Sequence, residues 1–334
     1  MSFHDFLDRS PLGLERYDVI RYLGSGATSD VFLVVNKKNK RLYVLKQISL
    51  SNMTEKDRLQ IKQEIFVMDK IDHPNVVKFK ESFTGDSSVN IIMEYCECDT
   101  LEQLIERRRG KGRPFAEDLL VEWMAELLCA LAYIHSKGIL HRDIKTSNIF
   151  VTRKNHFKLG DFGVSTFLEN NEAGDWRMIG TPLNFAPEVC ESATYNERSD
   201  VWSLGVVFYE MCTLRPPFEA HNLFSLFEKI LTADVAPFQP GLSLRLEEIV
   251  REMLNKNPAQ RPTAQELIHE HWRVSASHPS HPSQNPQRGR LTQQLYGPET
   301  SSAKGWRCSC NRMTGTSICP RRSRGSTALR CRES

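Results

Sequence analysis

The stretch His141-Arg142-Asp143-Ile144-Lys145-Thr146-Ser147-Asn148 is followed, thirteen positions after Asn148, by Asp161-Phe162-Gly163. The carboxylate of Asp143 can orient an attacking hydroxyl, and Lys145, two residues later, can meet a transferring phosphate. Asn148 and Asp161 offer amide and carboxylate oxygens, which are ligands that Mg²⁺ prefers. Catalysis of phosphoryl transfer rests on positioning and on charge neutralisation. The stretch therefore predicts transfer of the γ-phosphoryl group of Mg-ATP to a hydroxyl.

Towards the N-terminus, residues 17–35 carry alternating and branched apolar residues that are interrupted by a glycine turn. Gly24 and Gly26 have no side chain, so backbone N–H groups there can approach phosphates. Ser29 stands where the G-x-G-x-x-G pattern has its third glycine, and residues 31–35 predict a strand where a dinucleotide-binding fold needs a helix. A plain hairpin turn would explain the two glycines equally well. The expected nucleotide contacts of the turn are Leu23, Gly24, Ser25, Gly26 and Ala27.

A lysine and a glutamate after this turn form the next candidate pair. Lys46 ends an apolar strand, and helical periodicity follows from Leu59 to Ile71. Glu64 lies on that helix and can hold Lys46 by an ion pair, so that the amine reaches the α- and β-phosphates. Each residue alone would be an ordinary solvated charge. Their order and spacing favour the pair.

Two further strands are predicted at 76–83 and 89–95, after His73-Pro74-Asn75 breaks the helix. The adenine ring is expected at the end of the second strand, where it would meet backbone groups and apolar side chains. The expected contacts are Met93 behind the ring, Glu94, Cys96, Val31, Val44 and Phe150. Each of these apolar side chains would suit an ordinary core equally well.

The rest of the chain up to residue 272 reads as mainly helical. Thr100 and Gln103 form a capping-box pattern at a helix start, and residues 119–135 predict a long amphipathic helix. Further helices are predicted at 223–232, 244–254 and 263–270.

Several residues around the catalytic stretch (residues 141–148) are expected to support it. The expected contacts are His141 with Phe162, Glu188 with Arg261, and Asp200 with the backbone of the catalytic stretch. A buried Glu188 needs a cation, and Arg261 is the expected partner. We expect this ion pair to be structural rather than catalytic. Thr181 can hydrogen-bond near Asp143 and shape the platform for the substrate.

The charge of the chain is unevenly distributed. The net charge is +3, but residues 273–334 carry eleven Lys or Arg and two Asp or Glu, which leaves the preceding residues at −6. The final segment is rich in Ser, Pro, Gln, Gly and Arg, which is typical of disorder. Its cysteines, at 308, 310, 319 and 331, have poor spacing for a zinc site. This basic tail is expected either to contact an acidic partner, such as a microtubule or an anionic membrane, or to stay solvated without a fixed partner, which is slightly preferred. Nucleic acid is not the expected partner.

Other features bear on the compartment. No apolar run approaches the ~20 residues that span a bilayer, so no transmembrane segment is expected. The first residues lack the charged and apolar regions of a signal peptide. Nine irregularly spaced cysteines in a chain of 334 residues favour reduced thiols and a cytoplasmic setting.

Taken in order, these motifs resemble those of eukaryotic protein kinases over residues 17–272, and in detail those of the NIMA-related serine/threonine kinases. The detailed resemblance is carried by Tyr43-Val-Leu-Lys-Gln-Ile48, Met93-Glu-Tyr-Cys-Glu97, residues 141–150, Lys158-Leu-Gly-Asp-Phe-Gly163, Glu210-Met-Cys-Thr-Leu214 and Pro217-Phe-Glu-Ala220. The resemblance implies a bilobal α+β fold: a small antiparallel β-sheet lobe with one main helix, and a larger, mainly helical lobe. The implied divisions are a leader at 1–16, the two lobes at 17–95 and 96–272, and the tail at 273–334.

The resemblance further implies transfer from Mg-ATP to Ser or Thr hydroxyls of protein substrates, in cell-cycle, ciliary or microtubule-linked roles. It implies a cytoplasmic location, with cytoskeleton or nucleus as further sites. The implied catalytic residues are Asp143, Lys145, Lys46, Glu64 and Thr181, and the implied metal ligands are Asn148 and Asp161. The alternative is a pseudokinase-like nucleotide-binding scaffold that acts through its basic tail.

The sequence departs from the family pattern in two places. Cys98-Asp99, followed by Thr100, replaces the usual glycine pair and acid, which puts hydrogen bonding to the ribose in doubt. The segment before Gly180 has no hydroxyl residue between Thr166 and Thr181. We hypothesise that Asp175 or Glu172 supplies a fixed negative charge to Arg142 in place of a phosphate. The alternative is that these acids are solvated and that activity depends on a partner.

Overall fold

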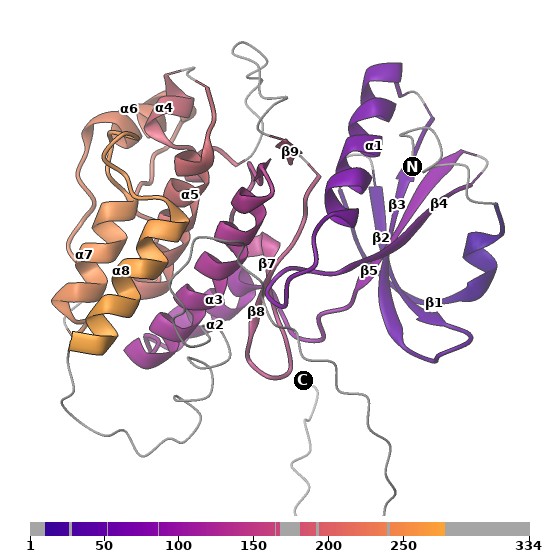
Figure 1. The fold of residues 1–334 in the computed structure, drawn as a ribbon, viewed down its shortest axis with the longest axis horizontal. Coiled ribbons are helices and arrows are strands. Elements are labelled where there is room, and N and C mark those ends of the chain that lie inside the picture. Colours follow the sequence, from indigo (N-terminus) through magenta and orange to yellow (C-terminus); the bar gives the residue numbers. More distant parts are fainter. Residues whose placement is uncertain are drawn as a thin grey trace, which may run out of the picture. The chain divides into compact units, whose positions relative to one another are not determined.

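A computed structural model describes residues 11–277, apart from 27–28, 52, 86, 164, 168–180, 192–193 and 239–240 (Figure 1). The chain divides into two compact units, Met1–Ser277 and His278–Ser334. The second unit, and with it almost all of the predicted tail, lies outside the described residues.

The first lobe is built on an antiparallel sheet with the strand order β1-β2-β3-β5-β4. The strands are β1 Tyr17–Ser25, β2 Ser29–Asn36, β3 Leu42–Ser49, β4 Phe79–Thr84 and β5 Ser88–Glu94. Helix α1, Glu55–Asp69, connects β3 to β4, and a short 3-10 helix η1, Pro11–Arg16, precedes β1. The antiparallel sheet with one main helix is the lobe that the sequence predicts.

The predicted strand at 76–83 is wrong at its start, because β4 begins only at Phe79. The three residues Asn75, Val76 and Val77 pair instead with Leu159 of the second lobe. The N–H of Val77 donates to the carbonyl of Leu159, and the N–H of Leu159 donates to the carbonyl of Asn75, each at 2.8 Å. Their backbone groups are therefore taken by the second lobe before they can join the sheet.

The two faces of the sheet serve different purposes because side chains alternate along each strand. One face carries a small closed core of Tyr17, Val34, Leu45, Phe83 and Ile92. The other face contributes Ile48, Val89 and Ile91 to the main core of the protein, which also contains the apolar side of α1. This second face therefore looks towards α1 and the main core.

Helix α1 begins four residues earlier than its apolar periodicity predicts. Thr54 caps it: the N–H of Asp57 donates to Thr54 Oγ1 at 3.3 Å, and the N–H of Thr54 donates to Asp57 Oδ2 at 2.9 Å. This reciprocal capping box satisfies backbone groups that the helix leaves open. The polar first turn is thus held by its cap rather than by core packing.

The second lobe is mainly helical. Its α-helices are α2 Leu101–Gly110, α3 Glu117–Ser136, α4 Pro187–Cys190, α5 Glu197–Thr213, α6 Leu223–Thr232, α7 Leu244–Met253 and α8 Ala264–Ser277. Short strands form the pairs β6 Ile139–Leu140 with β9 Thr166–Phe167, and β7 Ile149–Val151 with β8 Phe157–Leu159. Two 3-10 helices, η2 Thr146–Asn148 and η4 Pro182–Asn184, complete the described elements used below.

Helix α3 is the centre of this lobe, in contact with α5, α8, β6 and β8. Among the described residues it is the one helix long and apolar enough to cross a membrane. Its apolar side chains are nevertheless spent on the core, where Trp123 stacks on Phe157 with ring centroids 4.6 Å apart. Its composition is that of a core helix.

The last helix runs beyond its predicted end. We expect a helix at 263–270 and a tail from residue 273, but α8 continues to Ser277. Residues 273–277, Arg-Val-Ser-Ala-Ser, are too few to show the apolar periodicity of a helix, so the sequence does not reveal this continuation.

Candidate active site

Lys46 on β3 lies at the meeting point of three elements. Its Nζ is 2.9 Å from Glu64 Oε1 on α1 and 3.4 Å from Asp161 Oδ1, which follows β8. Burial alone lowers the pKa of Lys46, but the two carboxylates outweigh it and hold the pKa above its ordinary value. The amine is therefore a fixed cation, and the expected pair of Lys46 with Glu64 is confirmed.

The register of the sheet explains which apolar side chains accompany Lys46. Val31 of β2 lies directly opposite Lys46, and Met93 of β5 lies directly opposite Val44, two residues before Lys46. Residues directly opposite in an antiparallel pair share a face, as do residues two apart in one strand. Val31, Val44 and Met93 therefore share the face of the sheet from which Lys46 reaches Asp161.

Asp143 is held by three side chains. Lys145 Nζ is 2.7 Å from Oδ2, Asn148 Nδ2 donates to the same oxygen at 3.0 Å, and the Thr181 hydroxyl donates to Oδ1 at 3.1 Å. The hydroxyl of Thr181 thus marks a position from which an acceptor hydroxyl could donate to this carboxylate. The structure brings together the expected residues Asp143, Lys145, Asn148 and Thr181.

Asn148 has its amide oriented by its neighbours. Its Nδ2 donates to both the backbone carbonyl of Asp143, at 2.9 Å, and the Asp143 carboxylate. With the nitrogen so engaged, Oδ1 is the atom left for a cation, and an amide oxygen suits Mg²⁺. Asn148 is buried on η2, so its orientation is fixed before any ligand arrives.

Asp161 has a carboxylate of the kind that could bind a divalent cation. Its carboxylate stays 46% exposed although it touches Lys46. Partial burial raises the pKa of Asp161, but the positive charge of Lys46 lowers it by a larger amount. The pKa of Asp161 therefore lies below its ordinary value. Its φ of +59° is in the left-handed region, a strained conformation for a residue with a side chain. The donor chemistry of Asp161 and Asn148 fits a metal that is completed by phosphate oxygens and water.

Within the described residues no group of three or more His, Cys, Asp or Glu could hold a metal ion alone. The two protein ligands expected here, one carboxylate and one amide, agree with that, because Mg²⁺ at a nucleotide site takes most of its oxygens from phosphates and water.

Gly163 belongs to the Asp161-Phe162-Gly163 motif, but the sequence alone assigns it no role in the site. A methyl group added there would lie 3.2 Å from Asp161 Oδ1, 3.4 Å from Lys46 Nζ and 3.7 Å from Glu64 Oε1. The three charged groups therefore close around a position that only glycine leaves empty.

Asp200, near the start of α5, fixes the backbone of the catalytic stretch. It is fully buried, and its carboxylate accepts the N–H groups of His141 at 2.9 Å and Arg142 at 3.0 Å. His135 Nε2 at 2.9 Å and the Tyr195 hydroxyl at 2.6 Å complete its surroundings. Burial raises the pKa of Asp200, and these hydrogen bonds and the nearby histidines bring it below its ordinary value. The expected anchor is confirmed, while His135 and Tyr195 carry no sequence signal for this role.

His141 is a packing residue, as expected. It is fully buried, with its ring centroid 4.8 Å from that of Phe162. Burial lowers the pKa of His141, so the ring is neutral. Nδ1 accepts the N–H of Asp143 at 3.3 Å and Nε2 lies 3.2 Å from the carbonyl of Gly160, which assigns the proton to Nε2.

The buried pair of Glu188 and Arg261 is also confirmed. Arg261 Nη1 and Nη2 donate to the two carboxylate oxygens at 2.7 and 3.0 Å, and Ser199 donates to Oε1 at 2.7 Å. This two-pronged geometry satisfies both oxygens of a buried anion. The bridge joins α4 to the loop before α8 and touches no reacting group.

The structure describes only some of the nucleotide contacts expected at the turn between β1 and β2 and at the end of β5. The N–H of Gly26 donates to the carbonyl of Ser29 at 2.7 Å, which closes the turn between β1 and β2. Ala27 lies outside the described residues, as do Glu172 and Asp175. Glu94 uses its N–H on the carbonyl of Lys78 and its carboxylate on Lys158, which leaves its carbonyl oxygen as the candidate for a base.

The departure at Cys98-Asp99-Thr100 has a structural role. The Thr100 hydroxyl caps α2 by accepting the N–H of Gln103 at 3.4 Å, and the carboxylate of Asp99 forms an ion pair with Arg107. Both side chains that could meet a ribose are thus already engaged with α2.

Residues 17–273 match the family model described as "Protein kinase domain". Among curated relatives, the chain is 38% identical over 256 residues to "Serine/threonine-protein kinase Nek5" of Homo sapiens. It is 37% identical over 255 residues to Nek1 of Mus musculus, and 38% identical over 256 residues to Nek11 of Homo sapiens. Each match covers 76% of this chain, but only 36%, 21% and 40% of the respective relative. The chain thus spans less than half the length of these relatives.

Proposed function

Because the chain belongs to the protein kinase family, we propose that it is a serine/threonine kinase of the NIMA-related type that uses Mg-ATP on protein substrates. The observation that carries the proposal is the convergence of Lys46, Glu64 and Asp161 beside an Asp143 held by Lys145. The relatives, all of them Nek serine/threonine kinases, support the choice of acceptor.

Each residue has a role that follows from its contacts. Lys46, fixed by Glu64, neutralises and positions the phosphates. Asn148 Oδ1 and Asp161 would hold a Mg²⁺ ion, which would supply further neutralisation of the phosphate charge. Asp143 accepts the proton of the substrate hydroxyl. As it does so, the hydroxyl oxygen of the substrate bonds to the γ-phosphorus, and the bond between the γ-phosphorus and the oxygen that bridges it to the β-phosphate breaks. Lys145 lies beside that carboxylate and stabilises the negative charge of the transferring group. Mg-ATP supplies the phosphoryl group and leaves as Mg-ADP.

A nucleotide-binding scaffold without transfer is the alternative. A scaffold has no chemical need for Asp143, Lys145 and Asn148, which a transferase requires together. Their mutual hydrogen bonds favour the transferase.

The test is a radiolabelled phosphate-transfer assay with the full chain on Ser and Thr peptide libraries. Asp143→Asn should lower kcat by about 10³-fold, since it removes a general base. Lys46→Met should also lower turnover by orders of magnitude, whereas Lys154→Met, the same change at an exposed turn, should not. Transfer by wild type that Lys46→Met leaves unaltered would contradict the assignment.

Regulation of the site forms a second part of the proposal. We infer that Asp175 or Glu172 stands in for a phosphate beside Arg142, because no Ser or Thr occupies the segment between Thr166 and Thr181. Phosphatase-treated protein should then keep its activity, and Asp175→Asn combined with Glu172→Gln should lose most of it. Activity that phosphatase abolishes would overturn this part.

We also propose a cytoplasmic kinase whose basic tail meets an acidic surface such as a microtubule. The net charge of +9 in residues 273–334 supports the chemistry of that contact.

A further inference from the structure

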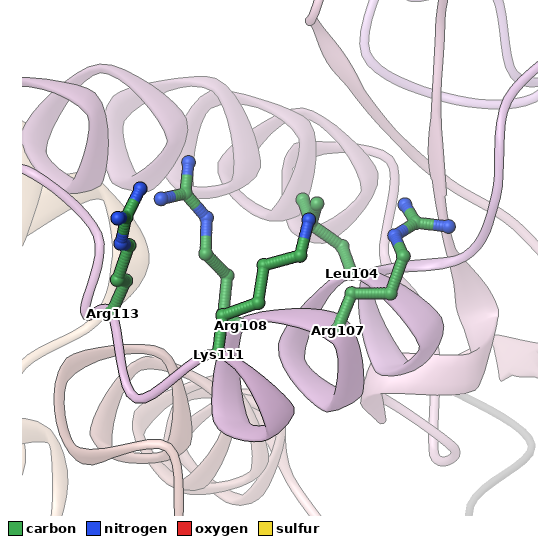
Figure 2. A pocket seen from close by; sticks show the side chains of 5 residues that line it. All are labelled: Leu104, Arg107, Arg108, Lys111 and Arg113. Carbon is green, nitrogen blue, oxygen red and sulfur yellow. The ribbon is translucent and has the colours of Figure 1, made fainter.

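A basic pocket lies on the second lobe, away from the residues of the candidate active site. It is a hollow of about 300 Å³ at the end of α2 and the turn that follows (Figure 2). Its lining residues are Leu104, Arg107, Arg108, Lys111 and Arg113. Four of these five residues are cationic and none is acidic, so the pocket presents concentrated positive charge.

The pocket is built by the way in which α2 ends. Gly112 has φ of +59°, which glycine adopts without strain. Its N–H donates to the carbonyl of Arg109 at 3.1 Å, and the N–H of Arg113 donates to the carbonyl of Arg108 at 3.2 Å. This pattern is the Schellman motif, which folds the chain back over the last helical turn. It returns Arg113 to the side of Arg108, so residues that leave the helix and residues within it line one hollow.

Stabilisation of the helix end does not account for all of these charges. Cations in the last turn of a helix interact favourably with the helix dipole. Arg107 and Arg109 lie in the last turn of α2 and also form ion pairs, Arg107 with Asp99 and Arg109 with Glu210. Lys111 and Arg113 are exposed and follow the helix, and the structure gives their side chains no ion pair among the described residues. Figure 2 shows the basic side chains extending towards the same side of the helix end.

The surrounding charge makes the pocket distinctive. Five Lys or Arg fall within residues 107–113, whereas residues 1–272 as a whole carry a net charge of −6. The pocket is therefore a local concentration of positive charge in a part of the chain whose net charge is negative, and it attracts an anionic segment. The chain's own tail, with its charge of +9, is excluded as the occupant by like charge.

We propose that this pocket docks an acidic segment, rich in Asp and Glu, of the protein substrates on which the proposed kinase activity acts. Arginine forks bind carboxylates in pairs of parallel hydrogen bonds, and Leu104 offers a small apolar contact. Helix α2 starts at Leu101, just after the strand end where adenine is expected, and its ten residues span about 15 Å. A segment docked at the far end therefore holds its acceptor residue near the active site and raises its effective concentration.

Direct binding tests the pocket independently of catalysis. The probe is a fluorescein-labelled polyglutamate peptide, with polyglutamine as the neutral control, measured by fluorescence anisotropy on the full chain at a salt concentration at which polyglutamate does not bind a synthetic peptide of residues 278–334. The pocket variant is Lys111→Glu with Arg113→Glu, and the matched variant is Lys38→Glu with Lys154→Glu, which changes the net charge equally at exposed lysines elsewhere. We expect Kd to rise at least about tenfold in the pocket variant and to stay within about twofold in the matched variant. Equal weakening in both variants would reduce the effect to net charge and overturn the proposal.

A phosphoserine peptide provides the competing occupant. Binding of this peptide through the pocket, with none of polyglutamate, would overturn the assignment to carboxylates in favour of phosphorylated partners. Lys111 and Arg113 are exposed, so thermal unfolding of the pocket variant should match that of wild type. The milder variant Lys111→Ala with Arg113→Ala replaces it if it does not.

A kinetic arm links the pocket to substrate choice. With a Ser/Thr peptide that carries a distant acidic segment, the pocket variant should show KM raised about tenfold and kcat unchanged. The same peptide without the segment should be phosphorylated equally by both proteins. Failure of wild type to phosphorylate either peptide would count against the proposed kinase activity, while anisotropy would still decide the pocket.

Discussion

Gly163 illustrates how a single absent methyl group keeps charged side chains in place. Asp161, Lys46 and Glu64 approach the position that a Cβ atom would take, at 3.2, 3.4 and 3.7 Å. The distance of 3.2 Å to Asp161 Oδ1 is tight for a carbon atom, so this carboxylate would have to move by a few tenths of an ångström, and Lys46 and Glu64 contact the same carboxylate or each other. In the proposed mechanism, metal binding and phosphate positioning both depend on those atoms.

We expect Gly163→Ala to lower kcat by about tenfold to a hundredfold, because a displaced Asp161 carboxylate no longer meets the metal in the productive geometry. The free energy of unfolding should change by less than about 1 kcal/mol, as the site is polar and partly exposed. Gly110→Ala, where nothing lies within 4 Å, is the control. Phosphate transfer and urea denaturation measure the two effects, and an unchanged kcat would contradict the account.

His73 contributes a pH dependence to the fold at its break between α1 and β4. Its ring stacks on Tyr133, with centroids 5.1 Å apart, and its Nδ1 accepts the N–H of Asn75 at 3.1 Å. Burial lowers the pKa of His73 to about 4; the charge of Lys158 acts in the same direction and that of Asp72 opposes it. The folded protein therefore holds this ring neutral at pH values where the unfolded chain is protonated.

Stability should accordingly fall as pH drops from about 7 towards 4, because the unfolded state binds the additional proton in that range. His73 accounts for up to about 3 kcal/mol of this loss. His73→Asn keeps an acceptor for the N–H of Asn75 but cannot titrate, so its unfolding free energy should fall less between pH 7 and pH 5. Urea denaturation of both proteins at the two pH values measures the difference, and parallel curves would refute it.

Among the elements, α4 and the loop before α8 depend on the buried pair of Glu188 and Arg261. Arg261→Ala should cost about 3–5 kcal/mol of unfolding free energy, since it leaves a buried carboxylate that keeps, among the described residues, the hydrogen bond from Ser199 but no cation. Arg16→Ala breaks a pair with Glu81 in which the arginine is 53% exposed, and should cost less than about 1 kcal/mol. Chemical denaturation compares the two; similar costs would mean that burial does not govern the pair.

The elements could be predicted where local patterns decide them. The turn between β1 and β2, the cap of α2 and helix α6 follow from residues close in sequence, and so does the resemblance to NIMA-related kinases, which the relatives confirm. The start of β4 could not be predicted, because backbone groups of Asn75 and Val77 pair with Leu159, more than eighty residues away. His135, which contacts Asp200 from 65 residues away, carries no sequence signal for the same reason, whereas Tyr195 is only five residues from Asp200 but forms no recognisable motif with it. Contacts between distant segments leave no spacing in the sequence.

At the scale of the whole molecule, every contact described for the candidate site lies within Met1–Ser277. Removal of residues 278–334 should therefore leave kcat/KM for a short peptide within about twofold of its full-chain value. Binding to an acidic surface such as a microtubule should weaken, because the deletion removes most of the basic tail. Peptide phosphorylation and co-sedimentation test the two halves, and loss of peptide phosphorylation would show that the tail belongs to the catalytic unit.

The backbone seam at Asn75, Val77 and Leu159 limits how the two lobes can part. Hydrogen bonds of 2.8 Å between peptide groups break rather than stretch, so a wide translation of one lobe from the other would cost both of them. A rotation of one lobe about an axis through these residues keeps both hydrogen bonds. ATP would then enter and ADP leave through a rotation of one lobe relative to the other, with Asn75, Val77 and Leu159 close to the rotation axis.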